Sequence, residues 1–500
     1  MTPTQSGDDE ARDARIDEVV ARILSRQAQA LSSTAGQDRS GDAGAMEREA
    51  RAATRRVDTS ASDRADISEV EYRQVRLERV VLVGLRTTQS EEEAENSLRE
   101  LAALAETAGS RVMDGVIQRR SLPDPATYLG SGKAKELADI VRAHEADTVI
   151  VDEELAPSQR RGLEDVVDAK VVDRTALILD IFAQHAKSRE GKAQVELAQL
   201  EYLLPRLRGW GESMSRQAGG RVAGGAGIGS RGPGETKIEL DRRRIRARMA
   251  KLKAEIARME PARRTQRGAR RRGGVPSVAI AGYTNAGKST LLNRLTDAGV
   301  LVEDALFATL DPTVRRARTA DGREYTLTDT VGFVRNLPTQ LVEAFRSTLE
   351  EVGAADVLLH VVDAAHPDPV SQVEAVRAVL SGIEGADRVP ELIALNKADL
   401  ATPEQLAVLR TAFPGSVALS AKTWYGVGTL RAALEDLLPR PSVLIDVVIP
   451  YSAGSLVHRV HEEGEVEREE YAAEGTRLVA RVDEALAAAV RAATAPRADE

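Results

Sequence analysis

A strand, a glycine-bounded loop and a helix constrain this chain more than any other feature. The apolar stretch PSVAIAG (Pro276–Gly282) predicts a buried strand, and TLLNRL farther along predicts the start of an amphipathic helix. Between them the sequence reads Gly282-x-x-x-x-Gly287-Lys288-Ser289, the spacing of a phosphate-binding P-loop. A chance glycine turn is a poor explanation in this context, so the loop predicts a bound nucleoside triphosphate.

Each residue type in this loop has a chemical task. Gly282 and Gly287 allow backbone conformations and close approaches that a Cβ atom would prevent. Successive N–H groups of the loop surround phosphate oxygens, and the helix N-terminus adds favourable partial charge. Lys288 reaches the β- and γ-phosphates, and the Ser289 hydroxyl ligates Mg²⁺. The expected nucleotide contacts here are Gly282, Tyr283, Thr284, Asn285, Ala286, Gly287, Lys288 and Ser289.

The stretch EYTLTDTVG (Glu324–Gly332) predicts a second strand, which ends in an Asp-x-x-Gly motif. Asp329 would hold Mg²⁺ through a water molecule. The N–H group of Gly332 would meet the γ-phosphate and respond to its loss. Thr330 and Val331, between these residues, are expected to lie beside the nucleotide as well.

Two later strands carry the signal for the base. ELIALNKAD (Glu391–Asp399) and SVALSAK (Ser416–Lys422) follow DVLLHVVDAA, a predicted central strand. A carboxylate at Asp399 can accept hydrogen bonds from N1 and N2 of guanine, a pair of donors that adenine lacks. Ligands bind at the carboxyl edge of an open α/β sheet, where all these motifs fall. We therefore expect guanine beside Asn396, Lys397, Asp399, Ser420, Ala421 and Lys422.

The segment between the P-loop and Asp329 should supply a threonine for Mg²⁺. FATLDPT offers Thr309 and Thr313, and spacing does not separate them, although we assign Thr309. The predicted catalytic residues are Lys288, Thr309 and Gly332, and the predicted metal ligands are Ser289, Thr309 and Asp329. Further nucleotide contacts are expected from Phe307, Ala308, Thr309, Leu310 and Asp311.

Phe333 follows the Asp-x-x-Gly motif, where many small GTPases have a glutamine that orients the attacking water. Phenylalanine cannot orient water, and no arginine finger is identifiable in the sequence. We expect the chain alone to hydrolyse GTP slowly, until a partner supplies or orders the missing group.

The fold class is predicted as α/β, a doubly wound and mostly parallel G domain with additional smaller domains. The first 71 residues contain no aromatic side chain and bury too little surface to offset their ordering entropy. We expect a disordered tail there, with a short helix near Ile16–Leu24. The expected parts are a tail (1–72), an α/β domain (73–183), a helical hairpin (184–272), the G domain (273–440) and an α+β domain (441–500).

Two predicted helices between the α/β domain and the G domain each carry an apolar stripe. The stripes are Leu197, Leu200, Leu204 and Leu207, and Ile245, Met249, Leu252, Ile256 and Met259. Their spacing of three and four residues favours an antiparallel hairpin with the stripes in contact. The alternative is that both helices pack onto a neighbouring domain.

The hairpin should carry an unusual loop and a basic stripe. Gly219–Glu235 is rich in glycine, and no strand precedes it, so a dinucleotide-binding loop is rejected. A linker and an RNA-contacting tip remain equal alternatives. Asp241–Arg272 holds fourteen Lys/Arg and three Asp/Glu, a net +11 within a chain of net charge −9. Such a stripe is typical of contact with a phosphate backbone.

Composition limits the remaining choices. The chain has no cysteine, which excludes disulfides, thiolate metal sites and cysteine nucleophiles and fits a reducing cytosol. No apolar run approaches the length of a membrane span, which leaves at most peripheral association. We expect a cytoplasmic protein, and a monomer because no exposed apolar seam is left over.

Together these motifs resemble the HflX family, within the Obg–HflX class of translation-factor-related GTPases. The resemblance covers about 75–490 and includes LFATLDPT, DTVGFVRNLP and NKAD. Its longer segments are PDPATYLGSGKAKEL (Pro123–Leu137), DRTALILDIFAQHAKSREGKAQVELAQLEYLLPRL (Asp173–Leu207), GSRGPGETKIELDRRRI (Gly229–Ile245) and GYTNAGKSTLLNRL (Gly282–Leu295).

The resemblance implies a Mg²⁺-dependent GTPase that is stimulated by ribosomes and binds the 50S subunit and the 70S ribosome through 23S rRNA. It also implies that the glycine-rich loop reaches toward the peptidyl-transferase region. Members of the family split stalled or idle 70S ribosomes, notably under stress. Two alternatives stay open: a hibernation or assembly factor that does not split ribosomes, and an ATP-dependent RNA remodeller.

Overall fold

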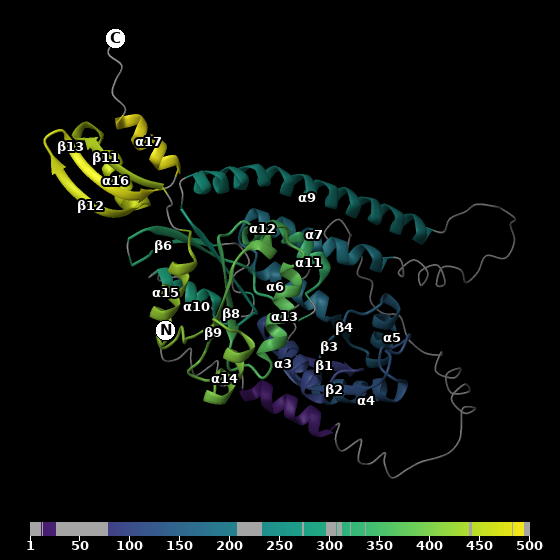
Figure 1. The fold of residues 1–500 in the computed structure, drawn as a ribbon. Helices are drawn as coiled ribbons and strands as arrows, with labels where there is room; N and C mark the ends of the chain where they lie inside the picture. Colours follow the sequence, from purple (N-terminus) through teal and green to yellow (C-terminus); the bar gives the residue numbers. More distant parts are fainter. Residues whose placement is uncertain are drawn as a thin grey trace, which may run out of the picture. The chain divides into compact units, whose positions relative to one another are not determined.

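The computed structural model describes most of the chain in two compact units, Met1–Asp180 and Ile181–Glu500 (Figure 1). The described residues are 12, 14–26, 79–207, 233–272, 275–296, 307, 313–320, 322–335, 337–439, 443–482 and 484–494. None of the described helices combines the length and the apolar character that crossing a membrane requires.

The first unit contains a parallel four-stranded sheet in the order β2-β1-β3-β4. Alternate residues of β1 face opposite sides, because a strand has a period of two. Val81 and Val83 pack with α4 and α5, and an added Cβ on Gly84 would contact Leu98 of α3. The elements are β1 (Arg79–Arg86), α3 (Glu91–Thr107), β2 (Arg111–Arg119), α4 (Ser131–His144), β3 (Thr148–Val151), α5 (Pro157–Val167) and β4 (Lys170–Asp173).

Residues 14–26 form a helix in this unit, shown in purple in Figure 1. Ile16, Val19, Val20 and Ile23 are buried, on one stripe of that helix. The short helix expected near Ile16–Leu24 is therefore present. Its four apolar side chains give this part of the tail enough buried surface to be ordered.

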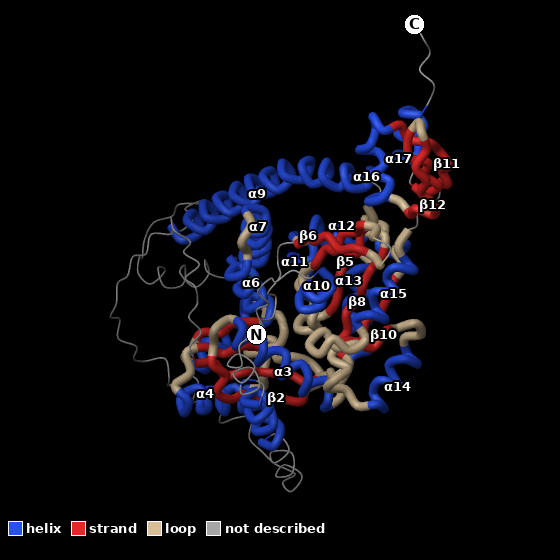
Figure 2. Tube along the Cα trace, turned by 90° about the vertical axis from the view of Figure 1, so that its left-hand side faces the viewer, coloured by secondary structure: helices blue, strands red, loops and turns tan. Residues whose placement is uncertain are grey.

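The G domain contains a six-stranded sheet in the order β10-β9-β8-β5-β7-β6. All neighbours are parallel except β6 and β7, and the strands are red in Figure 2. Val278 and Ile280 of β5 pack in one core with α10 and α15, and Ala279 and Ala281 pack in another with α12 and α13. Helices thus cover both faces of the sheet, which confirms the predicted doubly wound α/β class.

The G-domain strands are β5 (Ser277–Gly282), β6 (Thr313–Arg318), β7 (Glu324–Asp329), β8 (Val357–Asp363), β9 (Glu391–Asn396) and β10 (Val417–Ala418). Its helices are α10 (Lys288–Thr296), α11 (Thr339–Ala344), α12 (Arg346–Gly353), α13 (Pro369–Leu380), α14 (Pro403–Ala412) and α15 (Val427–Leu437). Strand β6 was not predicted from the sequence, and it lies at the sheet edge and alternates between half-buried and exposed residues at its start.

Three helices connect the α/β domain to the G domain: α6 (Arg174–His185), α7 (Arg189–Arg206) and α9 (Pro233–Arg272). The expected contact between the two apolar stripes is confirmed, since Leu197 and Leu200 of α7 pack against Leu252 of α9. The stripes are not the whole contact surface, because α7 also packs against α11 of the G domain. Glycine-rich residues 219–232 lie outside the described part of the chain.

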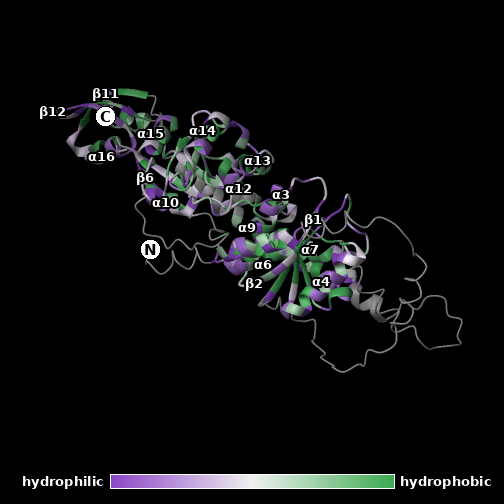
Figure 3. Ribbon diagram, turned by 90° about the horizontal axis from the view of Figure 1, so that it is seen from below, coloured by the Kyte–Doolittle hydropathy of each residue, from purple (hydrophilic) through white to green (hydrophobic). Residues whose placement is uncertain are grey.

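The C-terminal module is a small α+β unit whose antiparallel sheet has the order β11-β13-β12. Strand β12 is an edge strand, with mostly exposed and hydrophilic residues (Figure 3). The elements are β11 (Val443–Pro450), α16 (Gly454–Glu463), β12 (Glu465–Ala472), β13 (Gly475–Val482) and α17 (Glu484–Thr494).

Candidate active site

The predicted P-loop joins the end of β5 to the start of α10. Its backbone takes conformations that favour glycine, with φ of +151° at Gly282 and +90° at Gly287. An added Cβ would collide with the Val361 carbonyl at Gly282 and with the Asn396 side chain at Gly287. Glycine is therefore required at both positions for the loop to lie between β8 and β9.

Lys288 is buried at the first position of α10. Its Nζ donates a hydrogen bond to the Tyr283 carbonyl at 2.9 Å, so the side chain folds back over the loop. Burial lowers the pKa of Lys288 to about 8, although the Asp329 carboxylate opposes this shift. A phosphate would supply the negative charge that this buried ammonium group needs.

Gly332 lies beside the same amine. A Cβ built on Gly332 would stand 3.1 Å from Lys288 Nζ and 2.7 Å from Cγ2 of Thr284. The Asp-x-x-Gly turn is fixed to the P-loop, because Thr284 N–H donates to the Phe333 carbonyl at 2.7 Å. The two segments predicted to contact the γ-phosphate therefore lie next to each other.

Ser289 and Asp329 form the candidate Mg²⁺ site. The Ser289 hydroxyl donates to Oδ2 of Asp329 at 2.8 Å, and Asp329 is almost completely buried at the end of β7. Thr330 holds that end in place by donating its hydroxyl to the Ile280 carbonyl at 2.8 Å. Hydroxyl and carboxylate oxygens are the hard ligands that Mg²⁺ accepts, either directly or through water, so these residues fit the ion.

The choice of switch threonine stays a prediction. Thr313 is the first residue of β6 and pairs with Asp329 in the antiparallel ladder. Thr309 and its neighbours Ala308, Leu310 and Asp311 lie outside the described residues.

Asn396 joins the P-loop to the predicted base-binding loop. Its Nδ2 donates to the Ala286 carbonyl at 2.7 Å, and its Oδ1 accepts from the Ala421 N–H at 2.9 Å. Next to it, Lys397 has a φ of +59°, and its Nζ lies 2.7 Å from Oδ2 of Asp363. Asn396 thus acts as a buried clamp, while Asp399 is exposed where a base could reach it.

The loop that follows β10 is held by Arg294 of α10. Ser420 is fully buried, and its Oγ accepts from the Thr423 N–H at 3.1 Å. Arg294 donates to the Ala421 carbonyl at 2.9 Å, and its guanidinium group lies 4.8 Å from the centre of the Trp424 ring. Sequence reasoning missed Arg294, because nothing in its local pattern separates it from a surface arginine.

Phe333 packs inside the G domain, in a core that includes Tyr283, Leu349 and Val352. Its side chain is 2% exposed and points into this core, so it cannot orient a water molecule. The structure thus gives this aromatic residue a packing role, in which it anchors the Asp-x-x-Gly turn.

An aromatic cluster links the switch segment to the connecting helices. Phe307 is buried, with a φ of +61°, and its ring centre lies 4.5 Å from that of Phe182 on α6. Phe182 also lies 5.1 Å from Phe345, between α11 and α12. Both segments that flank the predicted γ-phosphate position therefore contact α6 or α7. No local sequence pattern predicts this contact, because the partners are far apart along the chain.

Comparison with known proteins identifies the family. Three family models match: "GTP-binding GTPase N-terminal" at 95–183, "GTP-binding GTPase Middle Region" at 185–270 and "50S ribosome-binding GTPase" at 277–397. The chain is 45% identical to GTPase HflX of Caldanaerobacter subterraneus over 405 residues, which is 81% of this chain and 91% of that protein. It is 43% identical to GTPase HflX of Escherichia coli over 395 residues, 78% of this chain and 90% of that one.

Among solved structures, a GTP-binding protein from Sulfolobus solfataricus in complex with GDP is 25% identical, with a TM-score of 0.38. The match covers 72% of this chain and 98% of that one. The relatives from Caldanaerobacter and Escherichia, at 45% and 43% identity, each match more than three quarters of this chain. The chain belongs to the HflX family of GTPases.

Proposed function

We propose that this GTPase binds the 50S subunit as a monomer and uses GTP binding and hydrolysis to separate stalled or idle 70S ribosomes into subunits under stress. The packing of α11 against α7 is the observation that carries the proposal. Helix α11 follows the Asp-x-x-Gly turn, and α7 packs on the long basic helix α9. A change at the γ-phosphate therefore has a short path to a surface suited to RNA.

The charge on α9 supports rRNA as the partner. Arg243, Arg246, Lys251 and Arg258 are exposed along this helix. On the side of α7, charges are already matched, since Arg248 pairs with Glu196 and Lys253 pairs with Glu201 at 2.9 Å. The four exposed cations named above can neutralise phosphates and release counterions. The glycine-rich loop between the helices is proposed to reach the same RNA.

The reaction depends on positioning and charge. The P-loop N–H groups and Lys288 would hold the phosphates, and Ser289, Asp329 and a switch threonine would hold Mg²⁺. When bound, the ion supplies positive charge to the β- and γ-phosphates. Gly332 would respond to the loss of the γ-phosphate and release the turn that ends at α11. Since Phe333 is buried in the core, the ribosome is proposed to complete the site for the attacking water.

The test is GTP hydrolysis by the purified protein alone, with 50S subunits and with 70S ribosomes, while light scattering follows subunit separation. Strong stimulation with GTP-dependent loss of the 70S signal would support the proposal. Stimulation without subunit separation would favour a hibernation or assembly factor. Fast turnover without ribosomes would contradict the role proposed for the partner. ATP hydrolysis that survives in an Asp399→Asn variant would point to a remodeller with a second nucleotide site.

A further inference from the structure

The helix of residues 14–26 packs on the first unit against the edge strand β2 and helix α3, and the surface that it covers is called the groove. Its apolar stripe is buried, with Val20 fully covered and Ile23 2% exposed. A Cβ built on Gly115 of β2 would stand only 2.6 Å from Cδ1 of Ile23. The tip of Ile23 therefore lies directly against the backbone of β2 at Gly115, where a side chain would also meet the Leu82 carbonyl of β1 at 2.9 Å.

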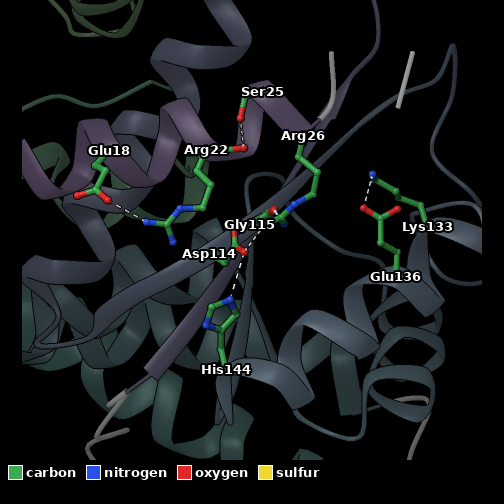
Figure 4. Close-up of polar contacts among 9 residues, drawn as sticks. All are labelled: Glu18, Arg22, Ser25, Arg26, Asp114, Gly115, Lys133, Glu136 and His144. Atoms are coloured by element: carbon green, nitrogen blue, oxygen red, sulfur yellow. Dashed lines mark hydrogen bonds and ion pairs between the residues drawn. The ribbon is translucent and has the colours of Figure 1, made fainter. Parts of the chain in front are cut away.

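Two arginines fix the ends of this helix in the groove. Arg12 Nε lies 2.8 Å from Oε2 of Glu106, near the end of α3. Arg26 Nη2 lies 2.7 Å from Oδ2 of Asp114 on β2 (Figure 4). Between them, Arg99 of α3 pairs with Asp17 at 3.0 Å. The groove thus covers the apolar stripe of the helix, presents Arg99 along its length and has a carboxylate at each end.

Asp114 gives the groove a specific need for a cation. It is 1% exposed, and it lies between Arg26 and His144, whose Nε2 is 3.2 Å from the same oxygen (Figure 4). The register of β1 and β2 shifts between Val80 and Val81, so a bulge at Met113 directs the carboxylate. A buried carboxylate is costly without a cation, and here the arginine comes from a segment 88 residues away.

Along the sequence, the helix is far from the first strand of its unit. Residues 27–78 separate it from β1, and the matched family models begin at residue 95. An isolated helix of this length is marginal in water, so folding and docking of residues 14–26 are coupled. Such a segment can leave and return without unfolding the sheet, because the sheet hydrogen bonds do not involve it.

We propose that residues 14–26 are a removable plug in a helix-binding groove, and that a basic amphipathic helix of a partner protein takes their place. The partner helix needs an apolar stripe of about two turns and a cation at each end of it, to meet Glu106 and Asp114. The plug keeps this groove covered until such a helix competes for it. This inference concerns the first unit and does not depend on ribosome splitting.

The experiment uses the full chain and a Val20→Asp variant, which places a charge in the middle of the buried stripe and undocks the plug. The probe is a fluorescent peptide with the sequence of residues 10–28, and binding is followed by anisotropy. We expect the variant to bind the peptide about tenfold or more tightly than the unchanged chain, whose groove is occupied. A peptide carrying Arg12→Glu and Arg26→Glu should bind the variant about tenfold or more weakly. Equal binding to both proteins, or none to the variant, overturns the proposal.

Hydrogen exchange provides a measurement that does not need the peptide. In the unchanged chain, amides of residues 14–26 should exchange faster than those of β1, and Arg26→Ala should accelerate them by about tenfold or more. The matched control is Arg22→Ala, since Arg22 is exposed and pairs with exposed Glu18 of the same helix (Figure 4). If residues 14–26 exchange as slowly as β1 in both Arg26→Ala and the unchanged chain, the helix is a permanent part of the core. That result would also overturn the proposal.

Discussion

Each unit of this chain has a glycine and a lysine at the start of a helix, in GYTNAGKS at α10 and in LGSGKAKE at α4, yet of these two only GYTNAGKS has P-loop geometry. The first turn leaves β5 at Gly282 and reaches the helix at Lys288. The second begins α4 at Ser131, well after β2 has ended at Arg119. A glycine and a lysine therefore do not make a phosphate loop unless the strand leads directly into the helix.

The backbone and the lysine differ in the same way. Gly130 has an ordinary φ of −64°, and its N–H donates to Gln118 Oε1 at 2.8 Å. Lys133 pairs with Glu136 of its own helix at 2.8 Å. Lys288, in contrast, is buried with its amine against the loop carbonyl of Tyr283. Positive φ and a buried lysine are what distinguish the nucleotide loop.

The carboxyl ends of the two sheets also differ. Asp152 follows β3 in the first unit and is held by Ser97 at 2.5 Å and by Arg174 at 2.7 Å. Burial raises the pKa of Asp152, while Arg174 lowers it. Asp329 at the end of β7 instead accepts from Ser289, a residue of the P-loop. The first unit satisfies its buried acid with its own arginine, whereas the G domain places its acid beside the ligand loop.

The largest effect, on the rate of GTP hydrolysis, is the difference expected between the two loops when the lysine of each is replaced by alanine. Lys288→Ala should lower GTP hydrolysis by about 10³-fold, because it removes the cation predicted to face the developing phosphate charge. Lys133→Ala is the matched control and should leave hydrolysis unchanged. Both variants are to be compared by phosphate release with and without ribosomes. An equal loss in the two variants would break the comparison.

The buried ion pair of the first unit gives the next effect. Arg174→Ala should destabilise this unit by about 3 kcal/mol, because it leaves Asp152 and Glu100 without their shared cation. The measurement is the hydrogen exchange of β3 and β4 amides in the full chain. Nucleotide affinity serves as the control and should not change. Unaltered exchange would mean that the pair adds nothing to stability.

Most of the G-domain site could be predicted from the sequence, because its signals are local. Gly287, Lys288 and Ser289 are consecutive, and their strand–loop–helix context defines their positions. Asp329 and Asn396 each end a strand with a clear apolar pattern. The parallel sheet then brings these strand ends to one edge.

The remaining features depend on contacts that no local pattern encodes. Arg294 supports the base loop across 127 residues, and Phe182 meets Phe307 from another helix. The plug helix was expected as an element, yet its docking to Asp114 depends on a bulge that sequence periodicity does not predict. Long-range pairing and strand irregularities therefore account for what the sequence analysis missed.

The predicted guanine contact gives the third effect. Asp399→Asn should weaken GTP binding by about 100-fold, since an amide cannot accept both hydrogen bonds from guanine. Xanthosine triphosphate should bind this variant better than GTP, because its extra carbonyl can accept from the new amide. Titration with both nucleotides tests this, and unchanged GTP affinity would remove Asp399 from the site.

The smallest effect is a pH dependence specific to the buried lysine. Burial lowers the pKa of Lys288 from 10.5 to about 8 in the nucleotide-free protein, and phosphate binds the charged amine. GDP affinity should therefore fall by about fivefold between pH 8 and pH 9, as the charged fraction of the amine falls. The free energy of unfolding of the nucleotide-free protein should instead rise with pH. Between pH 8 and 10.5 the unfolded chain binds the proton more tightly, so this lysine destabilises the fold less as pH rises. Affinity measured from pH 7 to 9 in Lys288→Met, which has no amine to titrate, should be flat. An equally flat profile in the unchanged chain would show that the buried lysine holds its proton without the nucleotide.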